Sequence, residues 1–273
     1  MTRVDLPGGF ALNVEVAGDG PPLVLLHGFT GSARSWGRFG ELFAERFTTV
    51  AVDLVGHGQS DAPADLEHYA MERCVEDTVT AVAKLGFERA PWLGYSMGGR
   101  TALQVANAEP GAVSALVLIG ASAGLDCVED RLARRSADGA LATRIERDGV
   151  EAFVDYWENI PLFATQQALP GDVRQRVREG RLGNHTVGLA NSLRGMGTGA
   201  QEPLHERLAE IAIPVLVLAG ELDVKYVEIG EQLAAMLPRA RFEAIPGAGH
   251  AAQLERPDDT AAAVLRFFDT TTT

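Results

Sequence analysis

Ser96 has the surroundings of a catalytic serine. It lies in GYSMG, residues 94–98, which fits the pattern G-x-S-x-G. In that pattern a strand turns sharply into a helix and the turn displays the serine hydroxyl. Such a hydroxyl is activated by a neighbouring base, and the base is oriented by an acid. The chain should therefore carry an acid and a histidine that fold next to Ser96.

Both groups are found downstream, in the order serine, acid, histidine that accompanies this pattern. Asp223 follows the expected strand Ile213–Ala219, and His250 lies in a glycine-containing loop after the expected strand Arg241–Ile245. Each residue stands at the carboxyl end of its strand, which is also the edge where Ser96 lies. We predict that Ser96, Asp223 and His250 form a catalytic triad.

Other polar residues near this edge suit different roles. His57 precedes Ser96, so its chain order is wrong for the base and we interpret it as structural. Asp53 is less well placed than Asp223 to orient a histidine. His27 begins a small glycine-containing turn, HGFTG, that can supply a backbone donor. We predict that the backbone N–H groups of Phe29 and Met97 form an oxyanion hole.

The elements that must position these residues are strands alternating with helices. Continuous apolar runs such as LVLL and VLVL are typical of strands buried on both faces of a parallel sheet. The alternation predicts an open α/β sheet with flanking helices. The expected strands are Phe10–Val16, Leu23–His27, Thr49–Asp53, Pro91–Tyr95, Val113–Ile119, Ile213–Ala219 and Arg241–Ile245. The expected helices are Ser35–Glu45, Met71–Lys84, Gly99–Ala108, Val227–Met236 and Pro257–Phe268.

The alternation stops between Ser122 and Pro203, where the pattern predicts only helices. These expected helices are Val128–Arg147, Val150–Trp157 and Asp172–Leu182. We interpret residues 1–121 and 203–273 as the core, and residues 122–202 as a helical cap inserted into it. Such a cap would cover the carboxyl ends of the strands, where open α/β sheets bind their ligands.

Composition restricts the class of partner. The chain has 273 residues and a formal charge of −13, which argues against binding to nucleic acid or to an anionic membrane. No apolar run approaches the roughly 20 residues that span a bilayer, and the N-terminus lacks the apolar core of a signal peptide. The two cysteines are far apart, which favours a reduced, cytoplasmic location but leaves a single disulfide open. We expect a monomer or small homo-oligomer that needs no metal or organic cofactor.

HGF at residues 27–29, GYSMGG at 94–99 and the later Asp and His resemble the α/β-hydrolase superfamily. Within it, LHGFTGSARSW, GYSMGGR, GLANSLRGMGTG, IPLFATQQALP and DVKYVEIG are similar to the 2-succinyl-6-hydroxy-2,4-cyclohexadiene-1-carboxylate (SHCHC) synthases of menaquinone biosynthesis. The similarity extends from about Leu25 to Pro257. It implies a lyase that expels pyruvate from 2-succinyl-5-enolpyruvyl-6-hydroxy-3-cyclohexene-1-carboxylate. Ser96, polarised by His250, would then act as a general base.

The resemblance also implies a polycarboxylate site. Arg100 lies in the first turn after Ser96, where a cation opposes the helix dipole at a cost of about 0.3–1 kcal/mol. Its family role is to bind a substrate carboxylate, and Arg134 and Arg181 match two further arginines of this kind. Tyr95, beside the serine, and Trp157 in DYWENIP are expected to be aromatic residues of the pocket.

The charged residues of the cap also have a purely structural interpretation. Most of its arginines are expected to lie on solvated faces or in i,i+4 ion pairs, including Arg131, Arg135, Arg174, Arg176 and Arg178. The segment SLRGMGTG, residues 192–199, is expected to be a turn that positions the cap, with Arg194 in a structural salt bridge.

Two other functions also fit the superfamily. A carboxylesterase or C–C bond hydrolase acting on a carboxylated substrate would use Ser96 as a true nucleophile. A non-catalytic binding protein with this fold is the second alternative, and the intact Ser, Asp and His set argues against it.

Overall fold

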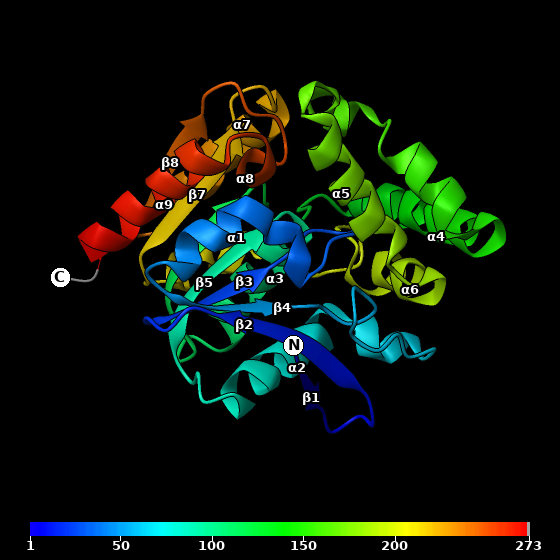
Figure 1. The fold of residues 1–273 in the computed structure, drawn as a ribbon, viewed down its shortest axis with the longest axis horizontal. Coiled ribbons are helices and arrows are strands. Elements are labelled where there is room, and N and C mark those ends of the chain that lie inside the picture. The colour runs from blue at the N-terminus through cyan, green and yellow to red at the C-terminus, as the bar shows by residue number, and fades with distance from the viewer. Residues whose placement is uncertain (272–273) are drawn as a thin grey trace.

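The computed structural model describes residues 1–271, which fold around one eight-stranded sheet of order β1-β2-β4-β3-β5-β6-β7-β8 (Figure 1). Neighbouring strands from β4 through β8 are parallel, whereas β1 and β2 pair antiparallel with each other and β2 with β4. The predicted mostly parallel sheet is therefore confirmed. The strands are β1 (Thr2–Asp5), β2 (Ala11–Ala17), β3 (Pro22–Leu26), β4 (Thr48–Val52), β5 (Ala90–Tyr95), β6 (Val113–Ile119), β7 (Val215–Gly220) and β8 (Ala240–Ile245).

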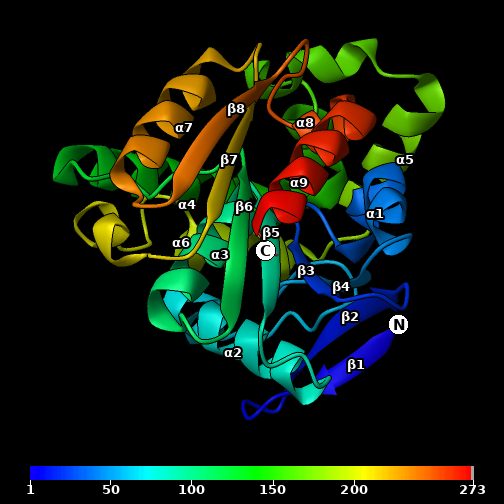
Figure 2. The same cartoon turned by 90° about the vertical axis from the view of Figure 1, so that its left-hand side faces the viewer.

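Helices cover both faces of this sheet. In Figure 2, α2, α3 and α7 lie on one side of the strands, and α1 and α9 on the other. The α-helices are α1 (Gly37–Ala44), α2 (Met71–Lys84), α3 (Met97–Ala108), α4 (Val128–Trp157), α5 (Gly171–Leu182), α6 (Thr186–Met196), α7 (Val224–Met236), α8 (Ala252–Glu255) and α9 (Pro257–Thr271). Short 3₁₀ helices are η1 (Ala33–Trp36), η2 (Leu66–Tyr69), η3 (Pro161–Ala168) and η4 (His205–Glu210).

Strand β3 shows why the apolar runs are continuous. Leu23 and Leu25 pack into the core beneath α1 and α9, while Val24 and Leu26 pack into the core beneath α2 and α3. All four are essentially buried, because successive side chains of a strand point to opposite faces of the sheet. The pattern that predicted strands buried on both faces is therefore confirmed here.

Helices α4, α5 and α6 and η3 all fall between β6 and β7 in the sequence. In Figure 1 they gather on one side of the molecule, apart from α7 and α9. Their own small core contains Ala142, Ile145, Phe153, Leu189 and Leu193. This is the segment interpreted as the cap, and the boundary at residues 122–202 stays a prediction.

Three local expectations differ from the structure. Strand β1 was not expected, because TRVD lacks an apolar run and forms only by pairing with β2. The two helices expected around Gly149 are one, α4, with a break at that residue, whose φ is +82°. The turn expected over residues 192–199 is wrong for its first part, since residues 192–196 end α6. The expected salt bridge of Arg194 is present, with Glu146.

The sharp β5–α3 turn should tolerate no side chain at Gly98, because a Cβ there would overlap the carbonyl group of Leu26. We expect Gly98→Ala to lower the free energy of unfolding by at least about 2 kcal/mol, through overpacking against backbone that cannot move aside. Gly139→Ala is the matched control, because its helical Cβ would meet nothing within 4 Å. It should raise stability by about 0.5–1 kcal/mol. Urea unfolding of both variants checks this, and equal stabilities would contradict the packing argument.

Candidate active site

The structure brings the three residues of the expected triad together. His250 Nε2 lies 3.1 Å from Ser96 Oγ, and its Nδ1 lies 2.7 Å from Asp223 Oδ2. Ser96 stands between β5 and α3, Asp223 between β7 and α7, and His250 in the loop after β8. The carboxylate requires the proton on Nδ1, which leaves Nε2 able to accept the proton of the serine hydroxyl. The arrangement can therefore deprotonate the Ser96 hydroxyl.

Ser96 has the backbone conformation of an exposed nucleophile turn. Its φ is +50° and its ψ is −109°, which non-glycine residues rarely adopt. Strain of this kind costs roughly 1–3 kcal/mol and persists only where the surroundings enforce it. The Ser96 N–H donates to the Ile119 carbonyl at 2.8 Å, and Gly94 and Gly98 let the strand and helix approach closely. The serine thus begins α3 with its side chain free for His250.

The His250 loop is fixed from below by a carboxylate that sequence analysis did not single out. Glu255, in α8, accepts the N–H groups of Gly249 at 2.7 Å and Ala251 at 3.3 Å. These two residues flank His250 in the chain. Because the peptide groups 248–249 and 250–251 are anchored on either side of His250, its backbone is fixed and the imidazole is held against Asp223 and Ser96.

The loop that contains Phe29 is shaped by a neutral histidine. His27 Nε2 accepts the Leu54 N–H at 3.1 Å, so its Nδ1 carries the proton and donates to the Gly28 carbonyl at 2.8 Å. Burial lowers the pKa of His27 to about 4, which keeps the ring neutral near pH 7. Because a trans peptide points its C=O and N–H in opposite directions, anchoring the Gly28 carbonyl also directs the Phe29 N–H.

The second expected donor, the Met97 N–H, lies in the first turn of α3. The first N–H groups of a helix have no partner within it and attract negative charge. Met97 directly follows Ser96, and Phe29 lies in the loop after β3, which pairs with β5. Their function in stabilising charge stays a prediction.

The two residues that sequence reasoning set aside do have structural contacts. His57 is fully buried, its Nδ1 lies 3.1 Å from the Val55 carbonyl oxygen, and burial lowers its pKa to about 3. The Asp53 carboxylate accepts hydrogen bonds from the backbone of Ala33 and Gln59 and from the side chain of Asn13. It therefore organises the loops beneath the site and has no contact with His250.

Arg100 is a buried cation, and no carboxylate of residues 1–271 lies within hydrogen-bond range of it. Its Nη1 donates to the Met196 carbonyl at 2.9 Å and to the side-chain oxygen of Gln201, both of which are neutral. Burial lowers the pKa of Arg100 to about 10, so it stays protonated near pH 7. It interacts electrostatically with Tyr226 and Asp138 nearby. The cation thus reaches from the helix behind Ser96 to the cap, with much of its charge uncompensated.

Arg134 reaches the same region from the cap. Its Nε donates to Asp138 Oδ1 at 2.8 Å, one helical turn along α4, and its side chain is 45% exposed. It also interacts electrostatically with Arg100 and Tyr226. Asp138 is buried, and burial raises the pKa of its carboxyl group. Arg134 thus brings a second guanidinium near Arg100, and the Asp138 carboxylate offsets part of the combined positive charge of the two arginines.

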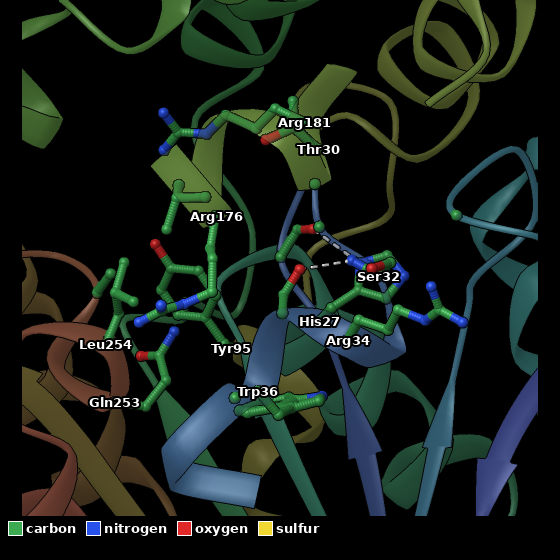
Figure 3. Close-up of a pocket in the computed structure, with 18 of the residues that line it drawn as sticks. His27, Thr30, Ser32, Arg34, Trp36, Tyr95, Arg176, Arg181, Gln253 and Leu254 are labelled. Carbon is green, nitrogen blue, oxygen red and sulfur yellow. Dashed lines mark hydrogen bonds between the residues drawn. The ribbon is translucent and has the colours of Figure 1, made fainter. Parts of the chain in front are cut away.

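A cavity of about 600 Å³ lies near the triad, since Tyr95 and Ala251, the chain neighbours of Ser96 and His250, line it (Figure 3). Tyr95 and Arg181 line it, together with Phe29 and Ala251, but Ser96 and His250 do not. In Figure 3, Arg176 and Arg181 come from α5 above, and Trp36, Gln253 and Leu254 close the cavity below. The two expected pocket residues Tyr95 and Arg181 therefore line a cavity near Ser96.

Arg181 is a second buried cation. Its Nη2 donates to the neutral Gln166 side chain at 3.1 Å, and its guanidinium lies 5.0 Å from the centre of the Phe163 ring. Burial lowers the pKa of Arg181. Trp157, the remaining expected residue, packs against Phe29 and Phe163, and its indole N–H has no partner among residues 1–271. It lies in the cap wall above Phe29.

Tyr226 is a site residue that sequence analysis missed. Its ring centre lies 4.5 Å from that of His250, and its phenol interacts electrostatically with Arg100, Arg134 and Asp223. Burial raises the pKa of Tyr226, so it is a neutral hydroxyl. The available signal was its position, three residues after Asp223 at the start of a helix, which places it one turn along on a neighbouring face.

Comparison with known proteins agrees with this geometry. The family model described as "alpha/beta hydrolase fold" matches residues 21–257. A Bacillus subtilis (strain 168) relative, provisionally named as an SHCHC synthase, is 44% identical over 94% of this chain and 95% of its own length. The SHCHC synthase of Salmonella agona (strain SL483) is 34% identical over 90% of this chain and 94% of its own.

A solved structure gives the same result. MenH from S. aureus superposes with a TM-score of 0.91 and 32% sequence identity, covering 96% of this chain and 99% of that one. The resemblance inferred from HGFTG, GYSMGGR and the cap motifs is thereby confirmed. This chain belongs to the 2-succinyl-6-hydroxy-2,4-cyclohexadiene-1-carboxylate synthase family, within the α/β-hydrolase fold.

Proposed function

We propose that this protein is a lyase that eliminates pyruvate from 2-succinyl-5-enolpyruvyl-6-hydroxy-3-cyclohexene-1-carboxylate to give SHCHC in menaquinone biosynthesis. The observation that carries this proposal is the unbroken Asp223–His250–Ser96 hydrogen-bond chain, together with the buried cation of Arg100, whose hydrogen-bond acceptors within residues 1–271 are neutral. Deprotonation of carbon next to a carbonyl needs a base and an oxyanion site, and a substrate with three carboxylates needs cations.

The difference between substrate and product defines the steps. Ser96, polarised by His250, takes the proton from ring carbon 2, which is acidified by the adjacent succinyl carbonyl. The electron pair forms the C2=C3 bond, the C3=C4 bond shifts to C4=C5, and the C5–oxygen bond breaks. The leaving group is the enolate of pyruvate, which takes up a proton at carbon and becomes pyruvate. Ser96 forms no covalent bond in this sequence.

Charge develops on the succinyl oxygen while the proton leaves. The backbone N–H groups of Phe29 and Met97 would donate to this oxygen, which is the contact that strengthens only in the transition state. Asp223 would stabilise the imidazolium that forms at His250 and keep its ring in place. Removing one such donor in an enzyme typically costs a factor of about 10²–10³ in rate.

The arginines would bind the three carboxylates of the substrate. The acceptors of Arg100 in the described part of the chain, residues 1–271, are neutral, so an incoming carboxylate would relieve the cost of its burial. Arg134 stands in the same region, and Arg181 lies in the adjoining cavity with Tyr95. Trp157 would close the apolar side of the site above Phe29.

A carboxylesterase or C–C bond hydrolase is the alternative that the same geometry can support. A Ser96 Oγ within 3.1 Å of His250 Nε2 can equally attack a carbonyl carbon, and the oxyanion donors would serve a tetrahedral intermediate. The two functions differ in whether a covalent intermediate forms on Ser96.

Other expectations stay predictions. No helix within residues 1–271 combines the length and the apolar character needed to cross a membrane. A cytoplasmic location, the lack of nucleic-acid binding, a cofactor-free reaction and a monomer or small homo-oligomer are proposed on the composition of the chain.

Pyruvate release tests the lyase directly. Wild type should release pyruvate from 2-succinyl-5-enolpyruvyl-6-hydroxy-3-cyclohexene-1-carboxylate well above the spontaneous rate, measured with a coupled lactate dehydrogenase assay. Ser96→Ala should lower kcat by a factor of about 10²–10⁴, the usual contribution of a positioned base. Ser136→Ala, an exposed serine of α4, should change nothing. Background pyruvate release by wild type, with serine-dependent hydrolysis of p-nitrophenyl acetate, would favour the hydrolase instead.

Arg100→Ala tests the carboxylate contact. We expect kcat/KM for pyruvate release to fall, mainly through a higher KM, because a hydrogen bond to a charged group is lost. The fall should correspond to about 1.5–3 kcal/mol of lost transition-state stabilisation. Arg147→Ala is the control, since Arg147 is exposed and pairs only with Asp148. Thermal unfolding shows whether losing the contacts with Met196 and Gln201 alters the fold. An unchanged kcat/KM would remove Arg100 from the substrate site.

A further inference from the structure

Asn184, two residues after the end of α5, forms side-chain hydrogen bonds to two loops of the core as well as to its own helix. Its Oδ1 accepts the Gly58 N–H at 3.0 Å, and its Nδ2 donates to the Thr30 carbonyl at 2.8 Å. Nδ2 also lies within 3.2 Å of the carbonyls of Gly180 and Arg181, at the end of its own helix. The amide orientation is fixed, because only the oxygen can meet an N–H and only the nitrogen can meet carbonyls. The side chain is buried, with 6% exposed.

The Thr30 carbonyl is the first link of a hydrogen-bonded chain that ends at the Phe29 N–H. Thr30 C=O and Gly31 N–H belong to one peptide group, and the Gly31 N–H donates to the Gly28 carbonyl at 2.9 Å. Gly28 C=O and Phe29 N–H belong to the peptide group 28–29, which is the second peptide group of this hydrogen-bonded chain. Because each peptide is planar, a donor on its oxygen orients and polarises its N–H. The hydrogen-bonded chain therefore runs from the Asn184 side-chain amide through the peptide group 30–31 to the peptide group 28–29, whose N–H would donate to the oxyanion.

Thr30 needs this support because its backbone is strained. Its φ is +67°, and a β-branched residue at positive φ is a genuine outlier. The bond from Gly31 N–H to Gly28 O closes a four-residue turn, and a positive φ at its third residue is the mark of a type II turn, which favours glycine or asparagine there. Thr30 and Arg181 lie at the same end of the cavity in Figure 3.

We propose that Asn184 is a positioning residue that couples the cap to the oxyanion hole, orienting and polarising the Phe29 N–H through the peptide groups 30–31 and 28–29. This inference rests on the proposed oxyanion role of Phe29. Docking of the cap would then set the strength of the donor, so a misplaced cap would slow chemistry even with the triad intact. Asn184 touches no reacting atom in this account.

The test compares two buried cap asparagines that both bond to core backbone. Asn184→Ala should lower kcat for pyruvate release about tenfold and change KM less than twofold, because only the transition state uses the oxyanion donor. Asn191→Ala is the matched control. Asn191 is 7% exposed and its Nδ2 donates to the Ala64 carbonyl at 3.2 Å, which is outside the 28–31 turn. It should leave kcat within twofold of wild type.

Two further variants separate positioning from general loosening of the cap. Asn184→Asp keeps the acceptor for Gly58 and loses the donor to Thr30, so it should lower kcat like alanine; it also replaces alanine if that variant unfolds. Adding Thr30→Gly to Asn184→Ala should recover several-fold of the lost kcat, since glycine takes positive φ without strain. Rates are compared only at temperatures below the melting temperature of every variant.

Several results would overturn the inference. Equal kcat losses for Asn184→Ala and Asn191→Ala would mean that cap docking alone is measured. A raised KM with unchanged kcat would show that Asn184 affects substrate binding and not the oxyanion donor. No recovery of kcat with Thr30→Gly would show that strain at residue 30 does not cause the loss. If wild type releases no pyruvate, the proposed function fails, and the same variants are then measured on p-nitrophenyl acetate, whose hydrolysis also develops an oxyanion.

Discussion

Ser96 adopts a backbone conformation that L-residues avoid, and the centre of the molecule is built to enforce it. The Ser96 N–H is bonded to Ile119 of the neighbouring strand, while Gly94 and Gly98 let β5 and α3 approach without a side chain between them. The same sheet edge then carries Asp223 after β7 and His250 after β8. A serine placed anywhere else on α3 could not meet both, because the helix would turn its hydroxyl away from the edge.

Charge is distributed unevenly around this edge. Most arginines of the cap are neutralised on the surface, such as Arg178 with Asp155 and Glu158. Arg100 and Arg181 instead are buried and donate to neutral oxygens. Burying a cation without a counter-ion is costly, and a bound carboxylate offsets that cost more effectively than water does. A protein with a strongly negative net charge can thus bind a polyanion, because its partner meets two local cations rather than the average surface.

The cap contributes more than a cover for the site. It supplies acceptors for Arg100 through Met196 and Gln201, a wall for Phe29 through Trp157, and the Asn184 amide for the 28–31 turn. Beneath that turn, His27 and Asp53 fix the same loop from the core with neutral and charged hydrogen bonds. The turn at residues 28–31 is therefore held between two parts of the chain that are distant in sequence, which explains how a strained threonine persists there.

The sequence by itself determined the architecture and the triad. Continuous apolar runs identified β3, β6 and β7, because burial on both faces leaves few polar positions, and the alternation of short apolar segments with helical patterns identified the other parallel strands. G-x-S-x-G, with an Asp and a His after later strands, predicted that Ser96, Asp223 and His250 meet. It did not identify β1, whose TRVD forms a strand only by pairing with β2. It also treated residues 192–199 as a turn, whereas α6 continues to Met196 because its Leu189, Leu193 and Met196 are buried.

Only the tertiary structure decided which polar groups surround the triad. Sequence analysis assigned no role to Tyr226, which lies within DVKYVEIG, or to Glu255 and Asn184. Each contacts a residue that is distant in sequence or on another element. Tertiary structure likewise separated Arg181, in the adjoining cavity, from Arg100 beside the triad. Local patterns record periodicity, turns and burial, which a short stretch of chain can express. Hydrogen-bond partners and uncompensated charge are properties of pairs brought together by folding, and no single stretch of sequence contains them.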